Sequence, residues 1–291
     1  MSDQAQFVAA DLEGLLDVAR AAARAGADVA VDWQRRGTLR VEEKTAAYDL
    51  VSQADRDSEA AVRAVLAERR PGDSILGEEA GASGDPSSPV TWVVDPIDGT
   101  TNYLYGLDQW AVSVAAVQTR TDGDAGPDGA PAAALGRVLA GTVLEPTVNR
   151  ETYARAGGGT FCNGQPVRVR ATADLRHCLI DIGFGSRGYR NHVGRLAQRL
   201  AFEMRDVRRG GSAATSLAMV ATGRAEAYWG PGIAAWDIAA GVLLVTEAGG
   251  VVGNLDGPSG GFLPAGRTCL AAGNNVFGPL RDLLHDVYAD D

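Results

Sequence analysis

Segments typical of strands and of helices alternate along the whole chain, and this order constrains the fold more than any other sequence feature. Short β-branched apolar runs predict strands, and longer runs with apolar residues three to four apart predict helices. We expect strands at 74–77, 90–95, 110–118, 138–144, 151–156, 178–183 and 225–229. We expect helices at 5–34, 55–70, 190–202, 212–222 and 237–248. The mixture, without internal repeats, favours a layered α/β or α+β fold.

The chain's 291 residues suit one large domain or two ordinary ones. We expect a division near EPTVNR, into an α+β part at 1–147 and an α/β part at 148–291. The segment 121–134, TDGDAGPDGAPAAA, is rich in Gly, Pro and Asp and predicts a surface insertion. The segment 157–167, GGGTFCNGQPV, predicts a turn-rich connection.

The composition excludes several kinds of partner. With 27 basic and 37 acidic residues, the formal net charge of −10 argues against nucleic acid or an anionic membrane surface. A small anionic substrate stays possible, because a bound cation reverses the local field. Cys162, Cys178 and Cys269 form no disulfide or zinc pattern, which favours a reducing, cytoplasmic setting. We expect no signal peptide and no transmembrane helix.

The string WVVDPIDGTTN at 92–102 carries the strongest chemical signal. A β-prone run delivers Asp95 to a strand end, and Pro96 is expected to stop the ladder because it has no N–H to donate. Asp98 then lies in a tight turn, and Thr100 and Thr101 offer hydroxyl and N–H donors just beyond it. The carboxylate oxygens suit Mg²⁺ as ligands, and the neighbouring hydroxyl and N–H donors suit a phosphate group.

Other acidic residues are unremarkable when each is taken alone. Glu78 and Glu79 in GEEAG suit a solvated loop. Asp237 in AWDIAAG is expected to cap the helix at 237–248. Asp55 and Asp57 in DLVSQADRDSE suit the first turn of a helix. Their significance depends on the order of motifs along the chain.

The chain resembles the inositol monophosphatase family, whose members are magnesium-dependent, lithium-sensitive phosphatases. The resemblance covers roughly residues 10–275, with its motifs in the family's order. The matching strings are DLVSQAD, GEEAG, WVVDPIDGTTNY, GTFCNGQPV, GGSAATSLAMVATGRAEAYW, AWDIAAG and VTEAGG. The resemblance implies a five-layer α-β-α-β-α sandwich and a homodimer.

The resemblance also implies a metal site with two to three Mg²⁺ ions. The implied ligands are Glu78, Asp95, the main-chain carbonyl of Ile97, Asp98 and Asp237. Glu78, Asp95 and Ile97 match the ligands of a first ion, and Asp95, Asp98 and Asp237 those of a second. Asp55 and Glu78 match the surroundings of a third, weaker ion.

The remaining implied roles concern the attacking water and the substrate. Asp55 and Thr100 match a pair that activates the water. Gly99, Thr100 and Thr101 match the residues that bind the phosphate. Glu79 lies beside the metal ligands and has only a supporting role. A strip beside the alcohol portion of the substrate is matched by Gly211, Ser212 and Ala213.

Elementary chemistry agrees with a metal-activated water as the nucleophile. Metal ions lower the pKa of water and neutralise charge on phosphate oxygens, so no nucleophilic serine is needed. Histidine catalysis and zinc are disfavoured, because His177, His192 and His285 all lie outside the motifs. We therefore expect a small phosphorylated polyol as substrate.

The resemblance weakens at Gly230, where inositol-specific members carry a glutamate that binds inositol hydroxyls. Inositol 1-phosphate remains the leading candidate by family frequency. Fructose 1,6-bisphosphate, histidinol phosphate and 3′-phosphoadenosine 5′-phosphate stay open, because relatives on this scaffold hydrolyse each of them. Two rivals of another class are a catalytically silent binding or regulatory homologue and a purely structural cation binder. The intact acidic set and the two threonines argue against both.

Overall fold

The computed structural model describes residues 7–36, 41–43, 50–120, 135–185 and 190–289. The helices are α1 (Ala9–Arg36), α2 (Gln53–Arg69), α3 (Thr100–Leu104), α4 (Arg190–Glu203), α5 (Ala213–Ala221), α6 (Ala235–Glu247) and α7 (Asn274–Ala289). The early strands are β1 (Val41–Glu43), β2 (Leu50–Ser52), β3 (Ser74–Gly77), β4 (Gly81–Ser83), β5 (Val90–Asp98), β6 (Ala111–Thr119), β7 (Leu135–Glu145) and β8 (Arg150–Arg155). The later strands are β9 (Thr160–Cys162), β10 (Gln165–Val167), β11 (Leu179–Ile182), β12 (Asp206–Arg208), β13 (Ala227–Pro231), β14 (Gly250–Asn254), β15 (Gly257–Pro258) and β16 (Thr268–Gly273).

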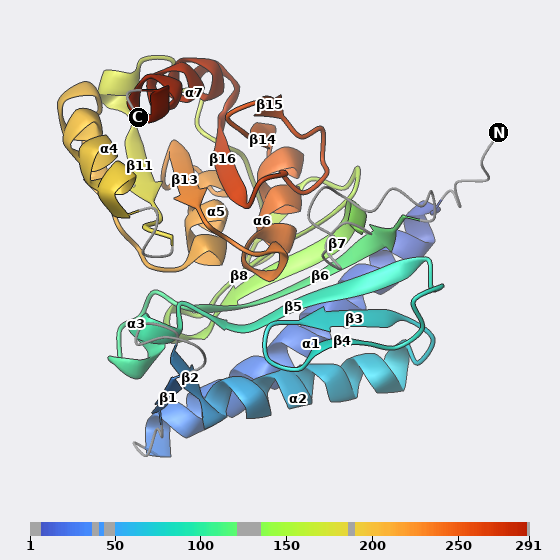
Figure 1. Ribbon diagram of the computed structural model, residues 1–291. Helices are drawn as coiled ribbons and strands as arrows, with labels where there is room; N and C mark the ends of the chain where they lie inside the picture. The colour runs from blue at the N-terminus through green and yellow to red at the C-terminus, as the bar shows by residue number, and fades with distance from the viewer. Residues whose placement is uncertain (1–6, 37–40, 44–49, 121–134, 186–189, 290–291) are drawn as a thin grey trace.

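Two large sheets and three helical layers confirm the predicted α-β-α-β-α sandwich (Figure 1), and β1 and β2 form a separate two-stranded sheet. An eight-stranded sheet has the order β10-β9-β8-β7-β6-β5-β3-β4, and a six-stranded sheet has the order β12-β11-β13-β16-β14-β15. Helices α1 and α2 pack on the outer face of the larger sheet, and α4 and α7 on the outer face of the smaller one. Helices α5 and α6 fill the space between the sheets. None of the helices in the described ranges is long and apolar enough to cross a membrane.

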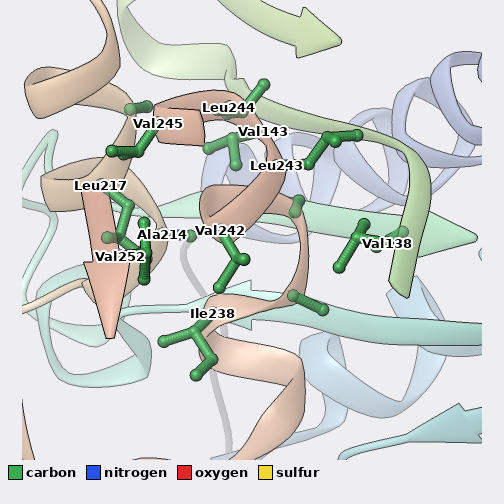
Figure 2. Close-up of a cluster of buried hydrophobic side chains, with 14 of the residues drawn as sticks. Val138, Val143, Ala214, Leu217, Ile238, Val242, Leu243, Leu244, Val245 and Val252 are labelled. Carbon is green, nitrogen blue, oxygen red and sulfur yellow. The ribbon is translucent and has the colours of Figure 1, made fainter. Parts of the chain in front are cut away.

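The middle layer explains the composition of α6. Its residues 238–245 are all buried, because one side of the helix faces β7 and another faces β14. A helix covered on several sides must be apolar all round, unlike the amphipathic α1 on the outer face. Figure 2 shows Val242 and Leu243 of α6 in this cluster with Val138 and Val143 of β7.

Helices α5 and α6 approach closely at Gly241, which makes this position a test of the middle layer. A Cβ atom there would lie 2.6 Å from Cβ of Leu217, closer than atoms can pack. We expect Gly241→Ala to lower the free energy of unfolding by about 1–3 kcal/mol through overpacking. Gly14→Ala in α1 is the matched control, because a Cβ there meets nothing within 4 Å. The control should stabilise by about 0.5–1 kcal/mol, and urea melts of both variants measure the difference.

Several predicted boundaries are wrong, each for a local reason. Strand β5 does not end at Asp95: a bulge absorbs Pro96, and pairing resumes between Asp98 and Ala111. The connection at 157–167 contains the β9–β10 hairpin, whose turn, Asn163-Gly164, has positive φ at both residues. Asp237 is not the N-cap residue of α6, which begins two residues earlier; as the third residue of the helix it instead accepts a hydrogen bond from the N–H of the N-cap residue Ala234.

The predicted division at 147/148 falls between β7 and β8, which pair directly with each other. The strands that follow, as far as Val167, complete the larger sheet, and the smaller sheet begins with β11. The two-part division itself stays a prediction. The predicted insertion at 121–134 lies outside the described residues.

Candidate active site

The site is built where β5 ends and α3 begins. The bulge in β5 bends the chain so that the N–H of Ile97 donates to Oδ1 of Asp95 over 3.1 Å. Gly99 follows with φ of 94°, and a Cβ there would lie 2.9 Å from the carbonyl oxygen of Gln109. Only glycine fits both the left-handed backbone and the narrow space, so this turn is fixed by sequence.

Three carboxylates, two from β5 and one from α6, meet at this point. Oxygens of Asp95 and Asp98 from β5 and of Asp237 from α6 all lie within 4.8 Å of one another. Asp237 is the third residue of α6, and its Oδ2 accepts a 2.6 Å hydrogen bond from the N–H of Ala234. This acidic cluster, Asp95, Asp98 and Asp237, could bind a metal ion through oxygen ligands.

Asp98 also links the larger sheet to α5 in the helical layer between the two sheets. Its Oδ2 accepts 2.6 Å hydrogen bonds from the hydroxyl of Ser212 and from the N–H of Ala214. Ser212 caps α5, since its side chain also accepts from the N–H of Thr215. The N-terminal end of α5 is therefore anchored to a member of the acidic cluster, 114 residues away in the chain.

Burial and mutual repulsion raise the pKa values of the carboxylates in the acidic cluster. Burial raises the pKa of Asp95 well above its ordinary value, and the charges of Glu78, Asp98 and Asp237 raise it further. Burial raises the pKa of Asp98 and of Asp237 to about 7. Ionising three neighbouring carboxylates in a buried site costs much free energy unless a cation balances their charge.

The other acids predicted for the site surround this cluster. The charges of Glu78, which follows β3, and of Asp55 on α2 both raise the pKa of Asp95, so both groups lie near it. The hydroxyl of Thr100 lies 3.4 Å from Oδ1 of Asp55 and 3.2 Å from the carbonyl oxygen of Ile97. Thr101, the next residue of α3, is exposed.

Glu59, which the sequence analysis missed, organises the turn that carries Glu78. Its buried carboxylate accepts hydrogen bonds from the N–H of Glu79 over 2.7 Å and of Ala80 over 3.1 Å. The guanidinium of Arg63 donates to the same carboxylate over 2.7 Å. The available signal was the Glu–Arg spacing of four residues on α2, which is more often a surface pair.

Asp181 is a second missed residue. It is a buried acid in the apolar strand β11. Its carboxylate accepts 2.9 Å hydrogen bonds from the N–H of Gly210 and the hydroxyl of Ser216. These bonds fix the loop before α5 and the first turn of that helix, and thereby the position of Ser212. The signal available in the sequence, an acidic residue inside an apolar run, was not used.

Comparison with known proteins gives similarity across nearly the whole chain. The sequence profile of the inositol monophosphatase family matches residues 11–284. An inositol-1-monophosphatase of Mesorhizobium japonicum is 38% identical over 240 residues, covering 82% of this chain and 84% of that protein. The Nus factor SuhB of Pseudomonas aeruginosa is 35% identical over 273 residues, covering 90% of this chain and 92% of that protein.

Solved structures give the same result for the fold. The extragenic suppressor protein suhB from Bartonella henselae superposes with a TM-score of 0.81 at 30% identity, covering 95% of this chain and 98% of that one. An inositol monophosphatase from Anabaena superposes with a TM-score of 0.77 at 29% identity, covering 95% and 97%. The likeness therefore includes both sheets and all three helical layers.

Proposed function

The chain belongs to the inositol monophosphatase family and is a phosphatase, and we propose that it hydrolyses a small phosphorylated polyol, with inositol 1-phosphate as the leading candidate. The observation that carries the proposal is the convergence of Asp95, Asp98 and Asp237 within 4.8 Å beside the Thr100–Asp55 pair. Carboxylates at one point are suited to a cation, and a hydroxyl–carboxylate pair beside them is suited to holding a water molecule.

The donor set of the acidic cluster fits Mg²⁺. All three members are carboxylates, and no histidine or cysteine of the described residues joins them. Hard oxygen ligands suit magnesium, whereas zinc favours nitrogen and sulfur. We assign Glu78, Asp95, the carbonyl of Ile97, Asp98 and Asp237 as ligands of two to three ions. When bound, Mg²⁺ supplies charge neutralisation at phosphate oxygens and a more acidic water.

The chain's own residues complete the proposed mechanism. The Asp55 carboxylate accepts the hydroxyl hydrogen of Thr100, which leaves the oxygen of Thr100 free to accept from the attacking water and orient it. Backbone N–H groups at Gly99, Thr100 and Thr101 hold the phosphate, since the first N–H groups of a helix have no partner within the helix. Gly211, Ser212 and Ala213 line the alcohol portion, and Asp98 keeps that loop in place.

Phosphate release from a panel of esters tests the proposal. The panel holds inositol 1-phosphate, fructose 1,6-bisphosphate, histidinol phosphate, 3′-phosphoadenosine 5′-phosphate and p-nitrophenyl phosphate, each with magnesium or with EDTA. We expect magnesium-dependent release, highest kcat/KM on inositol 1-phosphate, and inhibition by lithium at tens of millimolar. Full activity in EDTA would refute the metal mechanism, and no release from any ester would favour a silent homologue.

Glu59→Gln is expected to raise the magnesium concentration for half-maximal activity by about 10- to 100-fold, the range found when a group supporting metal ligands is lost. The amide keeps one acceptor oxygen, so its NH₂ must face one of the two backbone donors, the N–H of Glu79 or of Ala80, and the turn that carries Glu78 shifts. Glu203→Gln is the matched control, because it breaks a Glu–Arg pair of the same spacing on exposed α4. Equal magnesium titrations for both variants would contradict the role of Glu59.

The proposed partner and compartment follow the family pattern. We propose a homodimer, for which light scattering should give twice the chain mass of 30.2 kDa. We propose the cytoplasm as compartment, in keeping with three cysteines that are all unpaired. Loss of activity under reducing conditions would argue against that setting.

A further inference from the structure

Tyr228 is a buried polar residue that the mechanism above does not use. It lies on β13 with only 2% of its surface exposed, on the strand face that packs against α5 and α6. Its neighbour Trp229 faces the opposite way, into the cluster with α4 and α7. Buried tyrosine hydroxyls ordinarily find a hydrogen-bond partner. Tyr103 follows this rule, since its hydroxyl donates to the carbonyl oxygen of Ala30 over 2.7 Å, whereas no hydrogen bond joins the hydroxyl of Tyr228 to another described residue.

Two glycines make room for this hydroxyl. A Cβ at Gly230 would lie 2.1 Å from the phenol oxygen of Tyr228, and a Cβ at Gly183 would lie 3.2 Å from it. Residues 228 and 230 project from the same face of the strand, so the phenol occupies the space of a side chain at 230. The resemblance implies a glutamate at this position in inositol-specific relatives, and here the phenol fills that space.

The phenol lies beside the acidic cluster. Strand β13 ends at Pro231, and α6, which carries Asp237, starts at Ala235. Burial raises the pKa of Tyr228 well above its ordinary value, and the charges of Asp98 and Asp237 add to the rise. The hydroxyl stays protonated and can donate a hydrogen bond to a ligand held by the cluster.

We propose that Tyr228 determines specificity by donating its hydroxyl hydrogen to an oxygen on the alcohol portion of the substrate. This inference rests on the proposed function, since it names the group that reads the same substrate. A carboxylate at 230 only accepts, and so requires a hydroxyl on the ligand. A phenol donates, and so takes a hydroxyl, a ring oxygen or a carbonyl oxygen. The substrate class is thus phosphate esters of polyols and sugars with such an oxygen near the phosphate.

The test is a specificity ratio, kcat/KM for the best polyol phosphate of the panel divided by kcat/KM for p-nitrophenyl phosphate. Apart from the ester oxygen that every substrate of the panel shares, the nitrophenyl ester has no oxygen near the phosphate for Tyr228 to contact. We expect Tyr228→Phe to lower the ratio about tenfold, the effect of one buried hydrogen bond. Tyr153→Phe is the matched control, because Tyr153 on β8 packs under Arg20 and against Phe161 on β9, and it should leave the ratio unchanged.

The outcomes separate the two proposals. A wild-type protein without magnesium-dependent release from any ester refutes the proposed function and this inference with it. An active wild type whose ratio is unchanged in Tyr228→Phe refutes the inference alone, as does an equal loss on both esters, which marks a structural role. Gly230→Ala is a second variant, since its methyl group displaces the phenol; it should lower the ratio in the same direction. A ratio unchanged there would also overturn the inference.

Discussion

Asp95→Asn is expected to lower kcat/KM for magnesium-dependent phosphate release by at least about a thousandfold, because metal assistance contributes several kcal/mol to the barrier. Asp95 lies at the centre of the acidic cluster, since its pKa is raised by the charges of Glu78, Asp98, Asp237 and Asp55. An amide has one acceptor oxygen and no charge. It can therefore no longer neutralise a cation shared between two positions.

The variant should stay folded, which separates lost chemistry from lost structure. The amide oxygen can still accept from the N–H of Ile97, so the bulge of β5 keeps its hydrogen bond. Removal of one charge from a crowded acidic cluster also relieves repulsion. We expect a Tm no lower than that of the wild type in EDTA, and calorimetry should detect weaker magnesium binding.

Asp57→Asn is the matched control for this prediction. Asp57 lies two residues from Asp55 on α2, but its carboxylate accepts from Trp33 over 3.0 Å and from Gln53 over 2.8 Å instead of joining the cluster. Its activity should stay within about threefold of wild type, as for residues that do not touch reacting groups. An Asp95→Asn variant that keeps a tenth of wild-type kcat/KM at saturating magnesium would contradict the assignment.

The parts of the site that are local in sequence were predictable. Asp95, Asp98 and Thr100 lie within six residues, and the strand–turn pattern alone brought them together. Asp237 comes from α6 far along the chain, so only the family resemblance linked it to them. The Ser212–Asp98 bond joins residues 114 apart, and no periodicity reports such a contact. Tertiary contacts of this kind depend on how layers stack, which a sequence pattern does not specify.

The last quarter of the fold was predicted least well. Glycine and alanine dilute the β-branched residues that mark strands: β14 has Gly250 and Gly253 around its two valines, and β16 ends in Ala271, Ala272 and Gly273. Helix α7 carries Gly278 and Pro279, which signal a break. Pro279 is the sixth residue of the helix, beyond the four N–H groups that have no intrahelical partner, so the helix lacks the hydrogen bond to the carbonyl of Asn275. Packing against α4 and the smaller sheet overrides these local signals.

The metal-free protein is expected to lose about 5–10 °C of Tm between pH 5 and pH 8. Asp98 and Asp237 have a folded-state pKa of about 7, raised above the ordinary value of 3.8 by burial. The folded state therefore binds more protons than the unfolded state between these values. Stability falls as pH rises through this window, because ionising each buried carboxylate opposes folding. For one isolated group the penalty reaches about 4 kcal/mol, and coupling within the cluster reduces the sum.

Magnesium isolates the contribution of the cluster from the rest of the protein. Burial also raises the pKa of Glu145 and Asp181, so these acids give a pH dependence of the same sign. Neither belongs to the acidic cluster, and magnesium should not relieve their share. Below pH 5 an opposite effect begins, because Glu151, whose pKa is lowered despite its burial by hydrogen bonds from Arg20 and Arg24, starts to lose its ion pairs. The window from pH 5 to pH 8 is therefore the informative one.

Scanning calorimetry across this window, in EDTA and in magnesium, gives the measurement. Magnesium should raise Tm most at pH 8, where the cluster is ionised and its charges need a cation, and least at pH 5, where protons hold the same oxygens. Asp237→Asn removes one of the three carboxylates and should shrink both the pH slope in EDTA and the magnesium effect. A magnesium effect of equal size at pH 5 and pH 8 would mean that the ion binds elsewhere, because protons and magnesium compete only if they occupy the same carboxylates.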